Sequence, residues 1–427
     1  ERRSRGLGDV YKRQILHVLP FYPSSSDGGF SVTDHKNVSK NLGTWSDIRL
    51  LSNHASIMSD LILNHSSIKG LWFNSFIKEK EDYKNFFFTI GDDFDFSKVI
   101  RPRDHNLIQI YNYKKKKKNL WCTFSHDQID LNFKDPFVLI EFIEIILLLL
   151  SKGITTFRLD AVAFIWKKHG TSCVNLPETH EIVKLLRLIV NFINPYALIV
   201  TETNLPRKEN LSYFGNNDEA NWIYNFPLPP LILYTFLFED SSKISGWSKS
   251  MPPAQINNAY LNFIASHDGI GMRPAEGILD NIILDKLFKR VKKNGGKFSF
   301  RKVESKNKVY EANITLFDAL KRTDFDKDGI FAVERYIAAH SILLALEGVP
   351  AIYFNSLFGT SNDQNAFIKT GIKRNINRFK WEFSDLSKKL KNKNSLENII
   401  YSKILKIISL RQKQIAFHPN ATQYTLT

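Results

Sequence analysis

The sequence predicts an α/β fold, a (β/α)8 TIM barrel, from two observations. Short apolar strands recur along the chain with helical patterns between most of them, and this alternation indicates a parallel sheet. Each strand ends in polar or charged residues, and TIM barrels build their active sites at the carboxyl ends of their strands. An eighth strand, before Ile15, would close the barrel. Seven strands are expected in the chain itself, over 15–21, 55–65, 153–162, 196–202, 220–226, 259–268 and 348–354.

Helices are expected between most of these strands, for example over 181–193 and 331–346. The strongest apolar stretch, 137–150, is also predicted to be a buried helix, because Asp135 can cap its start and Pro136 suits the first helical position. This stretch is too short to span a bilayer. No membrane association is therefore expected.

Two stretches interrupt the strand–helix alternation. Residues 66–134 are long and aromatic and predict a small inserted domain, whereas 275–330 is a long basic segment of the kind that is usually functional or disordered. The polar, patternless start of the chain is expected to be a non-native or disordered leader. The predicted organisation is a leader at 1–14, a first part of the barrel at 15–65, the inserted domain at 66–134, the rest of the barrel at 135–420 with its long loop region at 275–330, and a terminal segment at 421–427.

The amino-acid composition limits the classes of binding partner and the cellular compartment that can be expected. The 427 residues carry 59 Lys and Arg against 43 Asp and Glu, a formal net charge of +16. Codon usage that favours lysine is the first explanation and a surface for anionic substrates the second. Nucleic acid is not an expected partner. The run of lysines at 114–118 has no interleaved aromatic residues, and the chain has no recognisable nucleic-acid-binding module. The two cysteines, Cys122 and Cys173, form no disulfide framework, which predicts a reducing compartment and a cytoplasmic location. No metal site or cofactor is expected.

Three acids stand at the ends of three predicted strands: Asp160, Glu202 and Asp268. The strand ends of a barrel converge on one pocket, and a retaining glycosidase needs a carboxylate nucleophile and a carboxylic acid about 5–5.5 Å apart. Each acid alone could equally be a helix cap or part of a buried ion pair. The three together, with the strand-end histidines His65 and His267, favour sugar chemistry.

Arg158 and Asp160 lie two residues apart on one strand, so their side chains share a face. A cation beside a carboxylate lowers the pKa of the acid. We therefore expect Arg158 to hold Asp160 in its charged, nucleophilic form.

Four short stretches resemble the motifs of glycoside hydrolase family 13, the α-amylase family: "DLILNH" (60–65), "FRLDAV" (157–162), "TETN" (201–204) and "ASHDG" (265–269). The resemblance implies that Asp160 is the nucleophile, Glu202 the general acid/base and Asp268 the stabiliser of the transition state. Arg158, His65 and His267 would then hold the sugar, and Asp60 would be structural. The resemblance also implies that 66–134 is domain B, that the first barrel strand is missing at an N-terminal truncation, and that most of the C-terminal β-domain is absent.

Further stretches are similar to the sucrose phosphorylase subfamily, in which phosphate instead of water attacks the glycosyl-enzyme. They are "LPFYPSSSDGGFSVTDHKNVSKNLGTW" (19–45), "GTSC" (170–173), "YNFPLPPL" (224–231), "HDGIG" (267–271) and "NINRF" (375–379). The similarity implies that inorganic phosphate and a sugar are the partners and that α-glucose 1-phosphate is the product. It assigns residues to three tasks: Asp27 and Arg378 on the far hydroxyls of the glucosyl ring, Phe30 and Phe124 as its apolar wall, and Arg103 and Tyr310 on phosphate.

One departure from the sucrose phosphorylase pattern concerns the leaving group. Glu311 replaces a glutamine and Lys308 an acidic residue, at positions that help to hold fructose in that subfamily. The stretches "YEAN" (310–313) and "TETNLPRKENLSYFG" (201–215) look more like the branch that acts on glucosylglycerate or phosphorylated sucrose. A lysine in the acceptor loop suits an anionic aglycone, although a solvated surface lysine is an equally simple interpretation.

The leading hypothesis is thus a retaining α-glycoside phosphorylase, and three alternatives stay open. A hydrolase or transglucosylase of the same family would not need Arg103 and Tyr310 to hold phosphate. A non-catalytic barrel that serves as a partner protein would not keep all three acids. The third alternative is a truncated barrel that does not fold, because it would expose sheet edges. The sequence does not indicate an oligomeric state.

Overall fold

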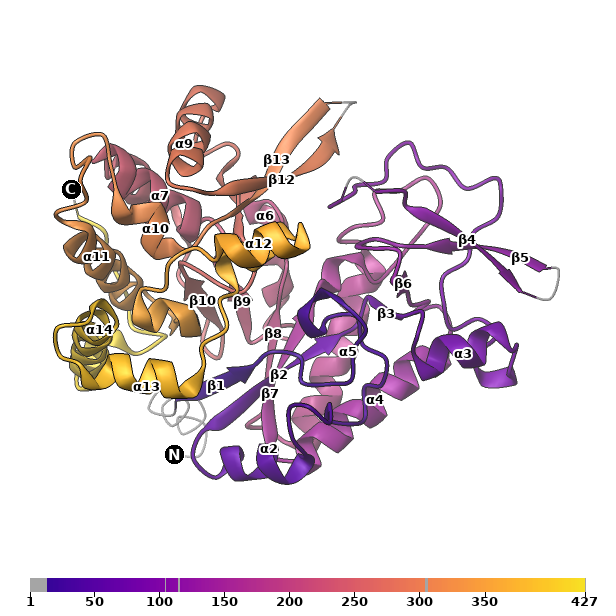
Figure 1. The fold of residues 1–427 in the computed structure, drawn as a ribbon. Coiled ribbons are helices and arrows are strands. Elements are labelled where there is room, and N and C mark those ends of the chain that lie inside the picture. Colours follow the sequence, from indigo (N-terminus) through magenta and orange to yellow (C-terminus); the bar gives the residue numbers. More distant parts are fainter. Residues whose placement is uncertain (1–13, 104, 114–115, 304–305, 427) are drawn as a thin grey trace. The chain divides into compact units, whose positions relative to one another are not determined.

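The computed structural model describes residues 14–103, 105–113, 116–303 and 306–426 (Figure 1). The chain divides into two compact units. The first runs to Thr203 and includes Lys208–Ile223, and the second comprises Asn204–Arg207 and the chain from Tyr224 onward. The domain boundaries expected from the sequence stay a prediction.

The seven predicted strands all form, and they occupy one sheet in the order in which they occur along the chain. Every strand-to-strand register given for this sheet is parallel, as the strand–helix alternation predicted. An α/β fold of the (β/α)8 type is confirmed. The strands are β1 (Ile15–Val18), β2 (Ser56–Ile62), β7 (Ile154–Asp160), β8 (Leu198–Thr201), β9 (Trp222–Tyr224), β10 (Ala259–Phe263) and β14 (Val349–Ala351).

Strands β2, β7 and β8 of the first unit are largely buried and carry apolar side chains on both faces, whereas β1 is only partly buried. All four residues of β8 are buried, and β7 is buried over most of its length. A parallel strand covered on both faces needs such a continuous apolar run. Arg158 and Asp160 on β7 are therefore exceptions that need partners.

The predicted apolar helix begins where the sequence places its cap, whereas the helix expected over 181–193 begins earlier, at Pro177. The side chain of Asp135 accepts from the backbone N–H of Phe137, and Pro136 occupies the first turn of the predicted apolar helix. No helix among the described residues is long and apolar enough to cross a membrane. The helices of this unit are α2 (Trp45–Ser52), α3 (Leu71–Ile77), α4 (Pro136–Ser151) and α5 (Pro177–Ile193), and α6 (Arg207–Leu211) begins in the other unit.

The segment between β2 and α4 holds two small antiparallel sheets. Strand β3 (His65–Ser67) pairs with β6 (Gln128–Asp130), and β4 (Ile108–Tyr113) pairs with β5 (Lys116–Trp121) (Figure 1). Buried phenylalanines pack between them and α3, which explains the aromatic composition of this stretch. The pairing of β3 with β6 matters for the site, because β3 begins at His65.

The second unit packs helices around a core that includes α7, α9, α10, α11 and α14. Residues 275–330, expected to be a long loop region, contain regular elements instead. Helix α9 forms there because Asp280 caps it and Leu284, Leu287 and Val291 give it a buried face. The elements of this unit, besides β10 and β14, are α7 (Leu228–Phe238), α8 (Ser242–Ser250), β11 (Ile270–Gly271), α9 (Asn281–Lys293), β12 (Lys297–Val303), β13 (Lys306–Asn313), α10 (Leu316–Lys321), α11 (Ala332–Ala345), α12 (Gln364–Thr370), α13 (Phe383–Lys391) and α14 (Leu396–Gln412).

Candidate active site

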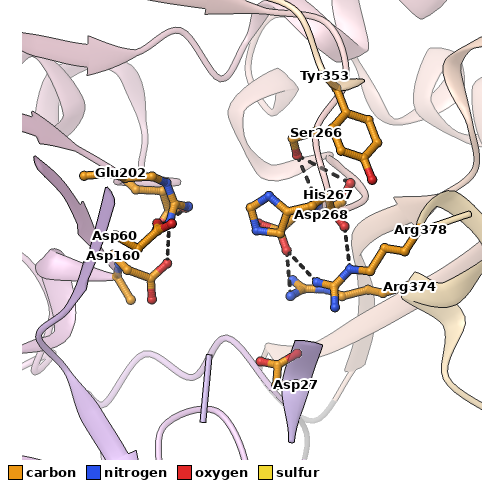
Figure 2. Close-up of polar contacts among 12 residues, drawn as sticks. Asp27, Asp60, Asp160, Glu202, Ser266, His267, Asp268, Tyr353, Arg374 and Arg378 are labelled. Atoms are coloured by element: carbon orange, nitrogen blue, oxygen red, sulfur yellow. Dashed lines mark hydrogen bonds and ion pairs between the residues drawn. The ribbon is translucent and has the colours of Figure 1, made fainter. Parts of the chain in front are cut away.

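In the first unit, one arginine connects three acids of neighbouring strands: Asp60 lies within β2, Asp160 ends β7 and Glu202 directly follows β8. The register of β2 and β7 places Asp60 opposite Arg158. Arg158 donates from Nη1 to Oδ1 of Asp60 at 2.5 Å and to Oδ1 of Asp160 at 2.7 Å. Its Nη2 lies 4.0 Å from Oε2 of Glu202. Arg158 is only 2% exposed, so these charges interact with little screening by water. Figure 2 shows the three acids Asp60, Asp160 and Glu202 grouped together.

Arg158 is only one of several groups that change the pKa of Asp160. Burial raises the pKa of Asp160, and the negative charge of Asp60 raises it further. Arg158 lowers the pKa, as expected, but does not outweigh the other two effects. The expectation that Asp160 would have a depressed pKa is therefore wrong, because burial raises the pKa more than Arg158 lowers it, and Arg158 is also shared with Asp60.

Glu202 is held next to Asp160 by the backbone. Its Oε2 accepts from the backbone N–H of Ala161 at 3.0 Å, and its own N–H donates to the carbonyl of Leu159 at 3.1 Å. Ala161 has φ of 50°, a left-handed conformation that is uncommon outside glycine. Such strain concentrates at functional sites, and here it lets the residue after Asp160 bind the neighbouring acid.

A second group in the first unit surrounds His65. Nε2 of His65 lies 3.1 Å from the carbonyl oxygen of Phe30 and 3.0 Å from Nε2 of Gln128. Gln128 also donates to Oδ2 of Asp27 at 3.2 Å. The ring of Phe124 lies 5.3 Å from that of His65.

Two cations reach the aromatic side chains of this group. The guanidinium of Arg103 lies 5.9 Å from the ring centre of Phe124, and that of Arg158 lies 5.9 Å from the ring centre of Phe30. These contacts connect Arg103 to His65 through Phe124. The first unit thus brings together eight residues that the sequence singled out: Asp27, Phe30, His65, Arg103, Phe124, Arg158, Asp160 and Glu202.

In the second unit, two arginines converge on Asp268, which follows β10. Oδ1 of Asp268 accepts from Nη1 of Arg374 at 2.7 Å and lies 3.5 Å from Nη2 of Arg378 (Figure 2). Arg378 also donates from Nε to the carbonyl of His267 at 2.8 Å, and Nε2 of His267 lies 3.4 Å from Oδ2 of Asp268. Asn377 donates to the carbonyl of Asp268 at 3.0 Å. Both the side chain and the backbone of this acid are therefore fixed.

Arg374 joins Asp268 to strand β13. It donates from Nε and Nη2 to the two carboxylate oxygens of Glu311, at 3.1 and 2.8 Å. Asn313 donates to the same carboxylate at 2.6 Å, and Glu311 is only 3% exposed. The contact is close: a Cβ on Gly269 would lie 2.4 Å from Cγ of Glu311.

The other two residues predicted for the acceptor side also lie on β13. The hydroxyl of Tyr310 accepts from Nδ2 of Asn204 at 3.4 Å, and the side chain of Lys308 is exposed. Tyr310, Glu311 and Lys308 thus share one strand. Tyr310 and Glu311 lie where β13 pairs with β11, just after Asp268.

Sequence reasoning missed Arg374 and Gln128. Arg374 lies four residues before Arg378 in the turn Lys373–Asn377, and that spacing was an available signal that both could face one acid. Gln128 offers no comparable signal, since its partners Asp27 and His65 are distant in the sequence. Within the described residues, no three side chains of His, Cys, Asp or Glu are grouped so that they could hold a metal ion.

Comparisons with known proteins identify the family of this chain. The catalytic domain of the α-amylase family matches residues 13–269. The glucosylglycerate phosphorylase of Allomeiothermus silvanus is 42% identical over 412 residues, which cover 96% of this chain and 74% of that protein. The glucosylglycerate phosphorylase of Escherichia coli is 38% identical, with 95% of this chain and 73% of that protein covered.

More distant phosphorylases align over a similar length. The sucrose phosphorylase of Agrobacterium vitis is 28% identical, covering 94% of this chain and 82% of that protein. The crystal structure of sucrose 6F-phosphate phosphorylase from Thermoanaerobacter thermosaccharolyticum superposes with a TM-score of 0.83 at 25% identity, covering 96% of this chain and 83% of that chain. The chain therefore belongs to the α-amylase family and, within it, to the glycoside phosphorylases.

Proposed function

We propose that this glycoside phosphorylase acts on α-glucosylglycerate, converting it and phosphate to α-glucose 1-phosphate and glycerate. One observation carries the choice of aglycone: relatives with this activity are 38–42% identical over at least 95% of the chain, whereas the sucrose phosphorylase of Agrobacterium vitis is 28% identical. The replacement of a neutral residue by Glu311 and of an acidic one by Lys308 supports an aglycone other than fructose.

The proposed reaction is a double displacement. The carboxylate of Asp160 attacks the anomeric carbon while the bond to the glycerate oxygen breaks, and Glu202 gives that oxygen a proton. Glu202 then takes a proton from phosphate, whose oxygen attacks the anomeric carbon and releases Asp160. Two inversions leave the product in the α configuration. Asp268 would stabilise the positive charge that develops on the sugar in both steps.

The remaining residues are proposed to bind the substrates. Arg158 and Asp60 support the position of Asp160 through the ion pairs described above. Arg103 and Tyr310 are proposed to hold phosphate, because a phosphate oxyanion needs fixed cations and hydroxyl donors. The glucosyl ring is assigned to Asp27, Phe30, His65, Phe124, His267 and Arg378.

A product assay tests the aglycone. The protein is incubated with α-glucosylglycerate, α-glucosylglycerol or sucrose, each with and without phosphate, and glucose 1-phosphate and free glucose are measured. α-Glucosylglycerol is the matched control, because it has a hydroxymethyl group in place of the carboxylate. We expect glucose 1-phosphate to form fastest from glucosylglycerate and only when phosphate is present. Faster turnover of sucrose would contradict the proposed aglycone, and free glucose as the sole product would identify a hydrolase.

We also propose a cytoplasmic location. Cys122 and Cys173 are both buried as free thiols, which suits a reducing compartment. Cell fractionation with activity measured in each fraction tests this proposal, and activity confined to the exterior would refute it.

A further inference from the structure

Asp27 lies in a loop, residues 24–32, whose two ends pair with each other. Ser24 pairs with Val32 across the loop, and the backbone N–H of Ser25 donates to the carbonyl of Ser31 at 2.9 Å. Asp27 has φ of 52°, a left-handed conformation that is uncommon for a residue with a side chain. This backbone conformation costs free energy, so the surroundings must hold it in place.

Asp127 accepts hydrogen bonds from four serine hydroxyls, three of which belong to this loop. Its Oδ2 accepts from Ser25 and Ser26 at 2.5 Å and from Ser31 at 2.8 Å. Its Oδ1 accepts from Ser67 of strand β3 at 3.0 Å. A carboxylate is an acceptor with about four lone-pair sites, so one ionised aspartate can satisfy all four hydroxyls.

The charge of Asp127 is maintained at neutral pH. Burial acts to raise the pKa of Asp127, but the four hydroxyls together outweigh it and lower the pKa. The carboxylate is therefore ionised at neutral pH.

Gln128, the residue after Asp127, contacts the side chains of Asp27 and His65. Gln128 donates to the carboxylate of Asp27 and lies within hydrogen-bonding distance of His65. Strand β6, which begins at Gln128, pairs with β3 through His65 and Asp130. Two consecutive residues thus fix the backbone that surrounds Asp27 and the direction of its carboxylate.

We propose that Asp127 is a positioning residue of the glucosyl site, which holds the loop of Asp27 in its strained conformation through the serine hydroxyls. This inference rests on the proposed function, in which Asp27 binds hydroxyls of the glucosyl ring. Asp127 acts through Asp27 and does not touch the substrate. Its contribution should therefore disappear when Asp27 can no longer bind the ring.

A double-mutant cycle tests the proposal. The variants are Asp127→Asn, Asp27→Asn and the double variant, and kcat and KM are measured with the glucosyl donor that the wild type uses best. An amide at position 127 has one oxygen acceptor instead of two, so the hydroxyls of the loop lose partners. We expect Asp127→Asn to lower kcat/KM by about 10-fold to 100-fold, since small displacements in a site cost that much. In the Asp27→Asn background the same change should have less than about a twofold effect.

Two further variants separate positioning from general folding. Asp326 also holds a loop through several hydrogen bonds, to the backbone N–H groups of Gly329, Ile330 and Phe331, but it lies outside the site. Asp326→Asn is the matched control and should leave kcat/KM unchanged even if it lowers the melting temperature. Ser26→Ala removes one exposed hydroxyl beside Asp27, and should lower kcat/KM less than Asp127→Asn with no loss of folded protein.

The outcomes distinguish the inference from the proposed function. If Asp27→Asn leaves kcat/KM unchanged, the assignment of Asp27 fails and the inference with it. If Asp27→Asn lowers kcat/KM but the effect of Asp127→Asn is absent or additive, the inference alone is overturned. If Asp127→Asn does not fold, Ser26→Ala in the wild-type and Asp27→Asn backgrounds gives the same comparison, and additivity there also overturns it.

Discussion

At the scale of single residues, the central feature is the guanidinium of Arg158, which serves both Asp60 and Asp160. Both acids are largely buried, and they share this one guanidinium, so ionisation of Asp160 beside Asp60 is unfavourable. Burial of a charge that is not fully compensated costs stability. The cost is consistent with a site that gives up stability to keep a reactive carboxylate.

The pKa of Asp160 leads to a stability prediction for Asp160→Asn. The pKa of Asp160 is raised in the folded protein, so ionisation favours the unfolded state. The loss of folding stability caused by ionised Asp160 is absent when the pH is below the ordinary pKa of an aspartate. It is fully present when the pH is above the raised pKa of the folded state. Asp160→Asn should therefore increase the free energy of unfolding at pH 7 by on the order of 1 kcal/mol, while turnover is abolished.

Urea unfolding at pH 7 and at a pH near 4 measures this effect, if the folded state persists at both. The gain from Asp160→Asn should shrink as the pH falls, because the wild-type carboxyl becomes protonated in the folded protein. A variant that is less stable than the wild type at pH 7 would contradict the prediction. Residual turnover by a pure preparation would reject Asp160 as the nucleophile.

At the scale of elements, Arg374 connects the segment after β10 to strand β13. It donates to Asp268 on one side and to the buried carboxylate of Glu311 on the other. A buried ion pair contributes little net stability, but removal of one partner leaves the other charge without compensation. Substitutions at residues 374 and 311 should therefore have strongly non-additive effects on the free energy of unfolding.

Arg374→Met should lower the free energy of unfolding by about 3–5 kcal/mol, the usual cost of breaking a buried ion pair. Adding Glu311→Gln should restore a large part of this loss, because the neutral amide removes the uncompensated charge. Urea unfolding of the two single variants and the double variant gives the coupling energy. Arg301→Met is a suitable control, since Arg301 pairs with Glu276, which is more exposed, and its loss should cost less. Additive effects of the changes at 374 and 311 would show that the two residues act independently.

At the scale of the whole molecule, local patterns predicted the strands of the seven-stranded sheet, but not the elements within 275–330 and not all the contacts between elements. All seven strands were predicted because each is a short apolar run that ends in polar residues. The contacts of Arg374 with Asp268 and of Gln128 with Asp27 join segments about 100 residues apart, and no periodicity reports such pairs. The raised pKa of Asp160 was also missed, because it depends on burial and on Asp60, whose effects appear only in the folded chain.

Competition between phosphate and water for the glycosyl-enzyme is what separates a phosphorylase from a hydrolase of the same fold. Phosphate must approach acids that repel it, so a fixed cation has to offset the repulsion. Arg103 is the proposed cation, and the structure connects it through Phe124 to His65. Arginine can donate two parallel hydrogen bonds to a phosphate. A water molecule that attacks the glycosyl-enzyme does not need these two donors.

Arg103→Ala should therefore raise the phosphate concentration that is needed for phosphorolysis, while formation of the glycosyl-enzyme is largely preserved. Water then captures more of the intermediate, and the ratio of glucose 1-phosphate to free glucose falls at every phosphate concentration. Lys98→Ala is the matched control, because it removes an exposed positive charge from the same segment of the chain and should leave the ratio unchanged. An equal fall in both variants would assign the effect to general electrostatics, and an unchanged ratio in Arg103→Ala would mean that this residue does not hold phosphate.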